Sequence, residues 1–288
     1  MRLSTDMTVL WQRYGHEKAI EIIKRAGFDA VDYCYWKMWN NTPAMSEEYE
    51  EYARTLRGYL DAAGLPCNQI HIPWPLAYGE KMDESEFHFA ASARSILAAG
   101  ILGAKVAVVH AVKIPEGEPV SVVDYNYEYM MALLPYAKRA GVRIGIENLF
   151  RRDPATNTFY SHLGTPAEIL SLLEKLPREH FGICIDVGHA ALTYGDPAKF
   201  IREVGRDKII ALHVHDVAKD EDSHQLPFLR TLNFEDITTA LREVGYDGDF
   251  TYEIEGYYQC FPEGMEEAAY AFSHRTGRHL IGMLEGGK

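Results

Sequence analysis

Short apolar runs alternate with longer amphipathic segments along the whole chain. The runs are apolar at successive positions, so both faces of a strand would be buried, as in a parallel sheet that helices cover. They lie at residues 2–7, 30–36, 67–72, 105–112, 143–149, 182–187, 209–217 and 249–255. The pattern therefore predicts eight buried β-strands.

The segments between these runs repeat their apolar residues at the spacing of an α-helix. Thr165 and Asp196 each precede a proline, which is typical of a helix start because the side chain caps free amides and proline fits the first turn. Gly27 and Gly141 are typical of the residue that ends a helix. Helices are predicted at residues 17–26, 46–63, 83–99, 123–140, 166–176 and 234–244.

Eight strand–helix units fill 288 residues without a linker rich in proline or serine. This number and size are typical of a (β/α)8 barrel, so we expect an α/β fold with one TIM-barrel domain over residues 1–288. The alternative is an open, doubly wound sheet. It would be expected to carry a glycine-rich phosphate turn after its first strand, and residues 5–15 contain no G-x-G-x-x-G motif.

The net charge and the cysteines limit which partners and which cell compartment we expect. A net charge of −13 disfavours nucleic acid and anionic membranes as partners. The 4 cysteines form no C-x-x-C pair, and no stretch approaches the roughly 18 apolar residues of a membrane span. Residues 1–15 lack the apolar core of a signal peptide, so we expect a reduced, cytoplasmic protein.

Polar side chains follow the predicted strands from the third to the eighth. The carboxyl ends of barrel strands meet at one face, where such barrels hold their chemistry. One histidine or glutamate at a strand end is usually hydrogen-bonded or solvated, but carboxylates and imidazoles gathered with few cations favour a bound metal. The residues are His71, His110, Glu147, Asp186, His189, His213, His215, Glu253 and Glu255, with Asp222 and His224 in the loop after the seventh strand.

Basic and aromatic residues near the same ends are candidates for substrate contacts. The cations are Lys113, Arg151, Arg152 and Lys219. Trp36 and Trp74 follow the second and third strands, where they either pack in the core or form a pocket wall.

Five motifs carry a resemblance that covers essentially the whole chain. They are IEN (146–148), DVGH (186–189), HVHD (213–216), DSH (222–224) and GDFTYEIE (248–255). In this order and spacing they resemble the xylose isomerase-like TIM-barrel superfamily. That superfamily contains sugar and sugar phosphate isomerases and epimerases, and the endonuclease IV type of AP endonuclease.

The resemblance to the one-metal ketose 3-epimerases implies a divalent ion, Mn²⁺, Mg²⁺, Co²⁺ or Zn²⁺, on Glu147, Asp186, His213 and Glu253. It implies that Glu147 and Glu253 are catalytic and that His189 contacts substrate oxygens. Lys219 stands where those epimerases have arginine, six residues after the metal histidine. We expect the substrate to be surrounded by His71, His110, His189, Lys219, Arg151, Trp36 and Trp74.

The resemblance to endonuclease IV implies a different site, with more than one zinc ion. His189, Asp222 and His224 would then be extra metal ligands, and His71 and His110 would complete a set of nine matching positions. However, loop 114–121 is acidic, whereas phosphate contacts dominate the affinity of proteins for DNA.

The sequence therefore predicts a metal-dependent sugar or sugar phosphate isomerase or epimerase. It would act by proton abstraction next to a carbonyl, through an enediolate. The alternative is an endonuclease IV-like zinc phosphodiesterase; a dehydratase and a catalytically silent sugar-binding barrel also stay open. We expect a small sugar as partner, no nucleic acid and no membrane, and leave open a homo-oligomer.

Overall fold

Eight parallel strands form the central sheet of the computed structural model, which describes residues 1–35, 38, 42–74, 76–81 and 83–286. The strands are β1 (Leu3–Asp6), β2 (Ala30–Cys34), β3 (Cys67–His71), β4 (Val106–Val109), β5 (Arg143–Glu147), β8 (Phe181–Asp186), β9 (Ile209–His213) and β12 (Phe250–Tyr252). They pair in that order, and β12 pairs with β1. A parallel bridge between Val214 and Tyr252 joins β9 to β12, which confirms the predicted TIM barrel.

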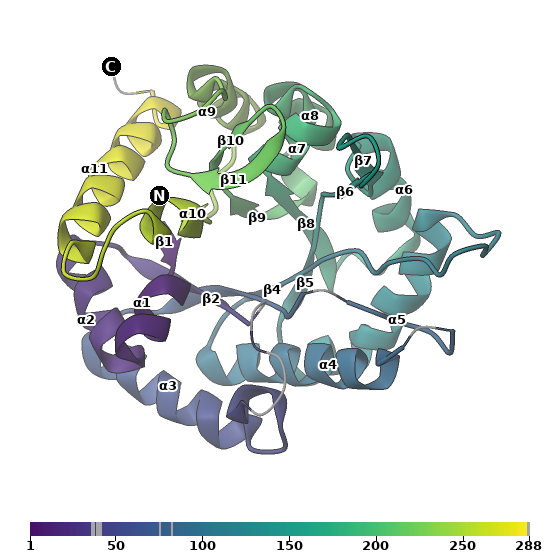
Figure 1. Ribbon diagram of the computed structural model, residues 1–288, viewed down its shortest axis with the longest axis horizontal. Coiled ribbons are helices and arrows are strands. Elements are labelled where there is room, and N and C mark those ends of the chain that lie inside the picture. Colours follow the sequence, from purple (N-terminus) through teal and green to yellow (C-terminus); the bar gives the residue numbers. More distant parts are fainter. Residues whose placement is uncertain (36–37, 39–41, 75, 82, 287–288) are drawn as a thin grey trace.

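Helices lie outside this ring of strands, and the last helix, α11, lies between α2 and α9 (Figure 1). The α-helices are α1 (Thr8–Tyr14), α2 (His16–Ala26), α3 (Tyr49–Ala63), α4 (Ser85–Leu102), α5 (Val122–Ala140), α6 (Pro166–Lys175), α7 (Val187–Thr193), α8 (Pro197–Val204), α9 (Phe234–Val244), α10 (Glu255–Gln259) and α11 (Glu266–Leu284). Two 3₁₀ turns, η1 (Pro43–Met45) and η2 (Arg206–Lys208), complete the helical elements of the described residues.

The predicted helix signals are confirmed. Thr165 and Glu168 form a reciprocal capping box at the start of α6, and the side chain of Asp196 accepts from the amide of Lys199 at the start of α8. Gly27 and Gly141 take the left-handed conformation directly after α2 and α5.

Two antiparallel hairpins at the carboxyl face were not predicted. One consists of β6 (Leu149–Arg152) and β7 (Phe159–His162), the other of β10 (Asp216–Ala218) and β11 (Glu221–Gln225). The strands predicted at 143–149 and 209–217 are therefore too long. β5 ends because the side chain of Asn148 binds both the amide and the carbonyl of Asp186 (2.8 and 2.9 Å), in place of the strand backbone. The strand predicted at 249–255 also ends early, since Glu255 begins α10.

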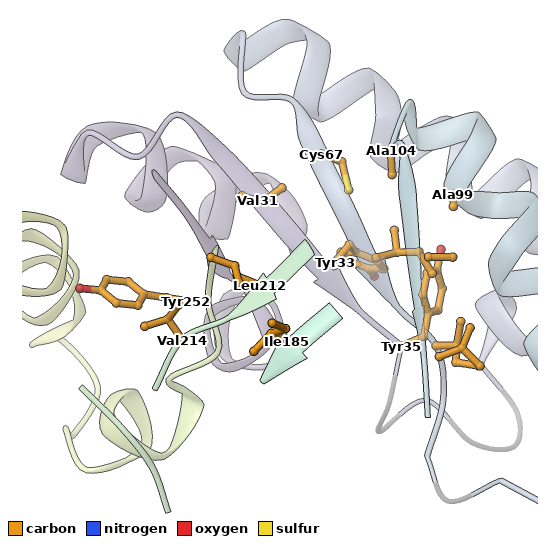
Figure 2. Close-up of a cluster of buried hydrophobic side chains, with 14 of the residues drawn as sticks. Val31, Tyr33, Tyr35, Cys67, Ala99, Ala104, Ile185, Leu212, Val214 and Tyr252 are labelled. Carbon is orange, nitrogen blue, oxygen red and sulfur yellow. The ribbon is translucent and has the colours of Figure 1, made fainter. Parts of the chain in front are cut away.

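The hydrophobic core lies between the outer faces of the strands and the helices. Figure 2 shows members of this core, among them Tyr33 of β2, Cys67 of β3, Leu212 of β9 and Tyr252 of β12, all fully or almost fully buried. Among the described residues, no helix combines the length and apolar character that crossing a bilayer requires. The helices thus serve to cover the barrel that holds the polar side chains.

Candidate active site and metal centre

The turn from β8 into α7 places two of the predicted residues. Asp186 ends the strand, and its Oδ1 accepts from the amide of His189 (2.6 Å), so the carboxylate caps the helix on which His189 lies. Position 188 has no room for a side chain, because a Cβ on Gly188 would lie 2.2 Å from Cε1 of His215. His215 in turn places Nε2 2.8 Å from Oδ2 of Asp186. This close packing fixes the position of Asp186 at the barrel mouth.

Glu147, at the end of β5, lies at the centre of the site. Its Oε1 is 2.8 Å from Nδ1 of His213, and its Oε2 is 2.7 Å from Nε2 of His110 and 3.2 Å from Nε2 of His71. His213 Nδ1 also lies 3.1 Å from Oε2 of Glu253. Side chains from β3, β5 and β9 and from the residues that follow β4 and β12 thus converge, as the barrel geometry predicts.

A second group lies beside the first and includes two residues of the hairpin β10–β11. Oδ2 of Asp222 is 3.0 Å from Nε2 of His224 and 3.4 Å from Nε2 of His189. The rings of His215 and His224 stack with centroids 4.1 Å apart, and Nδ1 of His224 lies 3.2 Å from Oε2 of Glu255. The hairpin therefore brings Asp222 and His224 to the barrel mouth.

These ligand atoms fit divalent cations. Four groups of atoms, three of which share residues, each lie within 4.8 Å of one another: one on Glu147, Asp186, His213 and Glu253, one on His71, His110 and Glu147, one on His71, His213 and Glu253, and one on His189, His215, Asp222 and His224. One buried oxygen in these groups, Asp222 Oδ1, accepts no hydrogen bond. Mixed carboxylate and imidazole sets of this kind suit Mn²⁺, Co²⁺ or Zn²⁺.

Hydrogen bonds to carbonyls fix the orientation of two of the imidazoles. Nδ1 of His71 donates to the carbonyl of Ile72 (2.9 Å), and Nδ1 of His189 donates to the carbonyl of Asn148 (3.0 Å). A ring that donates from Nδ1 directs its Nε2 toward the site. Both rings therefore present Nε2 to the cavity.

The carboxylates and imidazoles of the site shift one another's pKa. Burial raises the pKa of Glu147, but the neighbouring imidazoles of His213 and His110 outweigh it and bring that pKa well below its usual value. Burial lowers the pKa of His189, but the charges of Asp186 and Asp222 outweigh it and raise that pKa to about 10. Without a metal, protons held on the imidazoles balance the carboxylates, so a divalent ion would take their place.

A cavity of about 290 Å³ opens above these residues. Glu253 forms part of its wall, whereas Glu147 lies fully buried beside it. Phe150 closes one side, with its ring centroid 5.1 Å from that of His189. The lining residues are His71, Trp74, His110, Leu149, Phe150, His189, Asp222, His224, Glu253 and Glu255.

Comparison with known families agrees with this architecture. The model of the family described as "Xylose isomerase-like TIM barrel" matches residues 20–275. The chain belongs to this family. An uncharacterized protein of Methanocaldococcus jannaschii is 32% identical over 158 residues, which cover 53% of this chain and 51% of that protein. The matched region thus spans about half the length of that relative.

Solved structures extend the comparison to the whole barrel. A D-tagatose 3-epimerase-like protein superposes with a TM-score of 0.76 at 22% identity, covering 99% of both chains. A 3-keto-D-glucoside 4-epimerase from E. coli superposes with a TM-score of 0.72 at 20% identity, covering 97% of this chain and 99% of that one. At these identities the likeness shows a shared fold.

Not every predicted site residue of this xylose isomerase-like barrel lies at the cavity. Lys219 is exposed in the turn between β10 and β11 and is not among the lining residues. Arg151 is not among the lining residues either, but it contacts one of them, with its guanidinium carbon 5.0 Å from the centroid of the Trp74 ring. Trp36 lies outside the described residues.

Sequence reasoning missed two residues that contact the site. Phe150 was overlooked because it lies in the unpredicted hairpin β6–β7. Asp32 lies in β2, with Oδ2 3.4 Å from Nε2 of His213, and is completely buried. The sequence signal for Asp32 is an acid inside an otherwise apolar strand, because a buried carboxylate requires a polar partner.

Proposed function

We propose that this protein is a metal-dependent sugar or sugar phosphate isomerase or epimerase. The observation that carries the proposal is the group of Glu147, Asp186, His213 and Glu253 beside a cavity of about 290 Å³. That volume is at the small end of the range for ligand pockets, which suits a single sugar. The epimerases among the structural neighbours support the same class of reaction.

Glu147, Asp186, His213 and Glu253 would hold the divalent ion. When bound, the ion would supply Lewis acidity next to a sugar carbonyl. Glu253 lies on the cavity wall, where its carboxylate can take the proton from the carbon next to that carbonyl. Glu147, from β5, would return a proton from another side, which gives epimerisation through an enediolate. Transfer by one carboxylate between adjacent carbons would instead give aldose–ketose isomerisation.

His189 would stabilise the negative charge that develops on a substrate oxygen. Its Nδ1 is occupied by the carbonyl of Asn148, so its Nε2 is the atom available to the cavity. Asp222 lies 3.4 Å from that nitrogen and holds the ring in place. A preorganised donor of this kind lowers the barrier to proton abstraction.

Deuterium exchange tests this proposal. The protein, loaded with Mn²⁺ or Co²⁺, is incubated in D₂O with a panel of sugars and sugar phosphates, and incorporation at C2 or C3 is followed by NMR. We expect exchange in the wild type and its loss in Glu253→Gln, because the amide cannot accept the proton. Glu243→Gln is the matched control, since Glu243 is exposed and pairs with Arg202 on the helical surface. Unchanged exchange in Glu253→Gln would remove Glu253 from the mechanism.

A zinc phosphodiesterase is the second candidate, because the described residues offer four groups of possible ligand atoms, three of which share residues, rather than one. This function predicts about three tightly bound zinc ions per chain and cleavage of DNA at abasic sites. Metal analysis of the purified protein, together with an assay on an abasic-site duplex, separates the two. One ion with sugar exchange supports the isomerase, and three zinc ions with DNA cleavage and no exchange support the phosphodiesterase.

A further inference from the structure

Arg151 occupies an unusual position for an arginine in so acidic a protein. It lies in β6, partly buried, with its guanidinium carbon 5.0 Å from the centre of the Trp74 ring. Trp74 is a wall of the cavity, and its ring meets that of His110 edge-on at 5.0 Å. The cation therefore lies one aromatic ring away from the candidate metal centre.

No carboxylate of the described residues pairs with Arg151. Two other partly buried arginines have such partners: Arg13 lies 2.7 Å from Glu266, and Arg278 lies 2.5 Å from Asp29. Arg143, at the start of β5, instead donates to the carbonyls of Arg178 and Phe181 (3.1 and 2.8 Å). The pKa of Arg151 is lowered chiefly by burial, and the phenol of Tyr160 opposes this without reversing it. A partly desolvated cation without a counter-charge is costly for the folded protein.

Two of the hydrogen-bond donors of Arg151 also lack a suitable acceptor. Its Nε is buried without an acceptor. One terminal nitrogen of Arg151 lies 3.2 Å from Nε2 of His162. This ring nitrogen of His162 also lies 2.9 Å from the carbonyl oxygen of Val112. Burial lowers the pKa of His162 to about 4, so the ring is neutral, and a nitrogen that donates to Val112 has no lone pair for Arg151. Among the described residues Nη1 makes no hydrogen bond, so it is the donor that remains for an external acceptor.

We infer that the substrate carries a terminal anionic group, a phosphate or a carboxylate, which Arg151 binds at the Trp74 edge of the cavity. Two coplanar oxygens match the paired donors of a guanidinium, and the aromatic ring beneath holds its plane. The apolar side chains of Leu149 and Phe150 line the cavity and suit the carbon chain of the sugar. This inference rests on the proposed function, in which the carbonyl end of the same molecule lies at Glu147 and Glu253.

The test compares matched substrates in the metal-loaded full-length chain. Deuterium exchange is measured for a neutral ketose, for its terminal phosphate ester and for the corresponding sugar acid, in the wild type, Arg151→Gln, Arg151→Lys and Arg152→Gln. Arg152 is the control because it lies next in β6 but is exposed, with its guanidinium over Phe159. The phosphate and carboxylate arms identify which anion the site prefers.

We expect the wild type to favour an anionic substrate over the neutral sugar. Arg151→Gln should raise KM for that substrate about 10- to 100-fold, the size expected for lost hydrogen bonds to a charged group, with little change in kcat. Arg151→Lys should retain part of the affinity, and Arg152→Gln should match the wild type. Equal losses on neutral and anionic sugars in Arg151→Gln, or no loss on either, would overturn the inference.

A second measurement separates this inference from the proposed function. If no sugar exchanges deuterium in the wild type, the proposed function fails, and binding of inorganic phosphate and of acetate to the metal-free chain is then measured by NMR titration. Binding of either anion at least 10-fold weaker in Arg151→Gln than in Arg152→Gln supports an anion site on Arg151. Equal binding by the two variants excludes it. Circular dichroism and thermal unfolding verify that both variants are folded.

Discussion

Asp32 acts on the candidate site through His213 rather than through substrate. His213 directs Nδ1 toward Glu147 and Glu253, so its Nε2 is the atom that faces Oδ2 of Asp32, at 3.4 Å. Gln69 donates to the same oxygen from the other side (2.9 Å) and holds the carboxylate in place. A carboxylate behind a metal-binding histidine fixes the ring orientation and makes the ring a better ligand.

Replacing Asp32 should therefore weaken metal binding without removing a ligand. We expect Asp32→Ala to lower the affinity for Co²⁺ about 10- to 100-fold, and Asp32→Asn to have a smaller effect because its oxygen can still accept from the ring. Titration followed by the Co²⁺ absorption spectrum measures both. Asp220→Asn, an exposed change in the β10–β11 turn, is the control. Wild-type affinity in Asp32→Ala would show that Asp32 has no part in orienting His213.

The candidate ligands could be predicted from the sequence, whereas the residues that support them leave only a weak signal there, such as the acid inside the otherwise apolar strand β2. His71, His110 and Glu147 follow from one rule, that chemistry gathers at the carboxyl ends of barrel strands. Asp32 lies within β2 rather than at its end, and its carboxylate faces His213. A pattern of apolar runs does not reveal which strand positions face inward, because a barrel strand is buried on both faces.

The hairpin β10–β11 has no recognisable strand pattern of its own. Its second strand, Glu221–Gln225, has the sequence EDSHQ, without an apolar residue. Asp216 organises the chain around it: one carboxylate oxygen accepts from the amides of Val217 and Leu232 (both 3.0 Å), and the other accepts from the amide of Arg230 (2.7 Å). The element that carries Asp222 and His224 thus depends on tertiary hydrogen bonds, which no local pattern predicts.

The turn from β8 to α7 allows a test at the scale of an element. Gly188→Ala should destabilise the protein by about 1–3 kcal/mol, the usual cost of overpacking, because the added Cβ would lie 2.2 Å from the ring of His215. His215 binds Asp186, so the same change should also weaken metal binding. Chemical denaturation and Co²⁺ titration measure the two effects.

Gly58→Ala provides the matched control for that change. Gly58 lies within α3, and a Cβ there would meet nothing within 4 Å. Alanine is the better helix former, so Gly58→Ala should stabilise the chain by up to about 1 kcal/mol and leave metal binding unchanged. Equal stability in the two variants would show that the β8–α7 turn can relax around the extra methyl group.

At the scale of the whole molecule, His16 couples barrel stability to pH far from the cavity. It begins α2, and its Nε2 lies 2.7 Å from the hydroxyl of Tyr33 on β2 and 3.0 Å from that of Tyr52 on α3. Burial lowers the pKa of His16 to about 4. The neutral ring can accept a hydrogen bond from a tyrosine, whereas the protonated ring cannot. This contact joins one barrel strand to two of the surrounding helices.

The unfolded chain protonates His16 near its ordinary pKa of about 6.5, while the folded chain does so only near 4. Between these values the unfolded state binds more protons, so the contribution of His16 to stability falls as pH decreases from 6.5 to 4. We expect His16→Gln to lose less unfolding free energy than the wild type between pH 7 and pH 5, by on the order of 1 kcal/mol. Urea denaturation at both pH values measures the unfolding free energy of each protein. The contributions of the carboxylates cancel when the variant is compared with the wild type. His279→Gln, an exposed change on α11, should lose as much unfolding free energy as the wild type. If His16→Gln also loses as much as the wild type, another buried group controls the dependence of stability on pH.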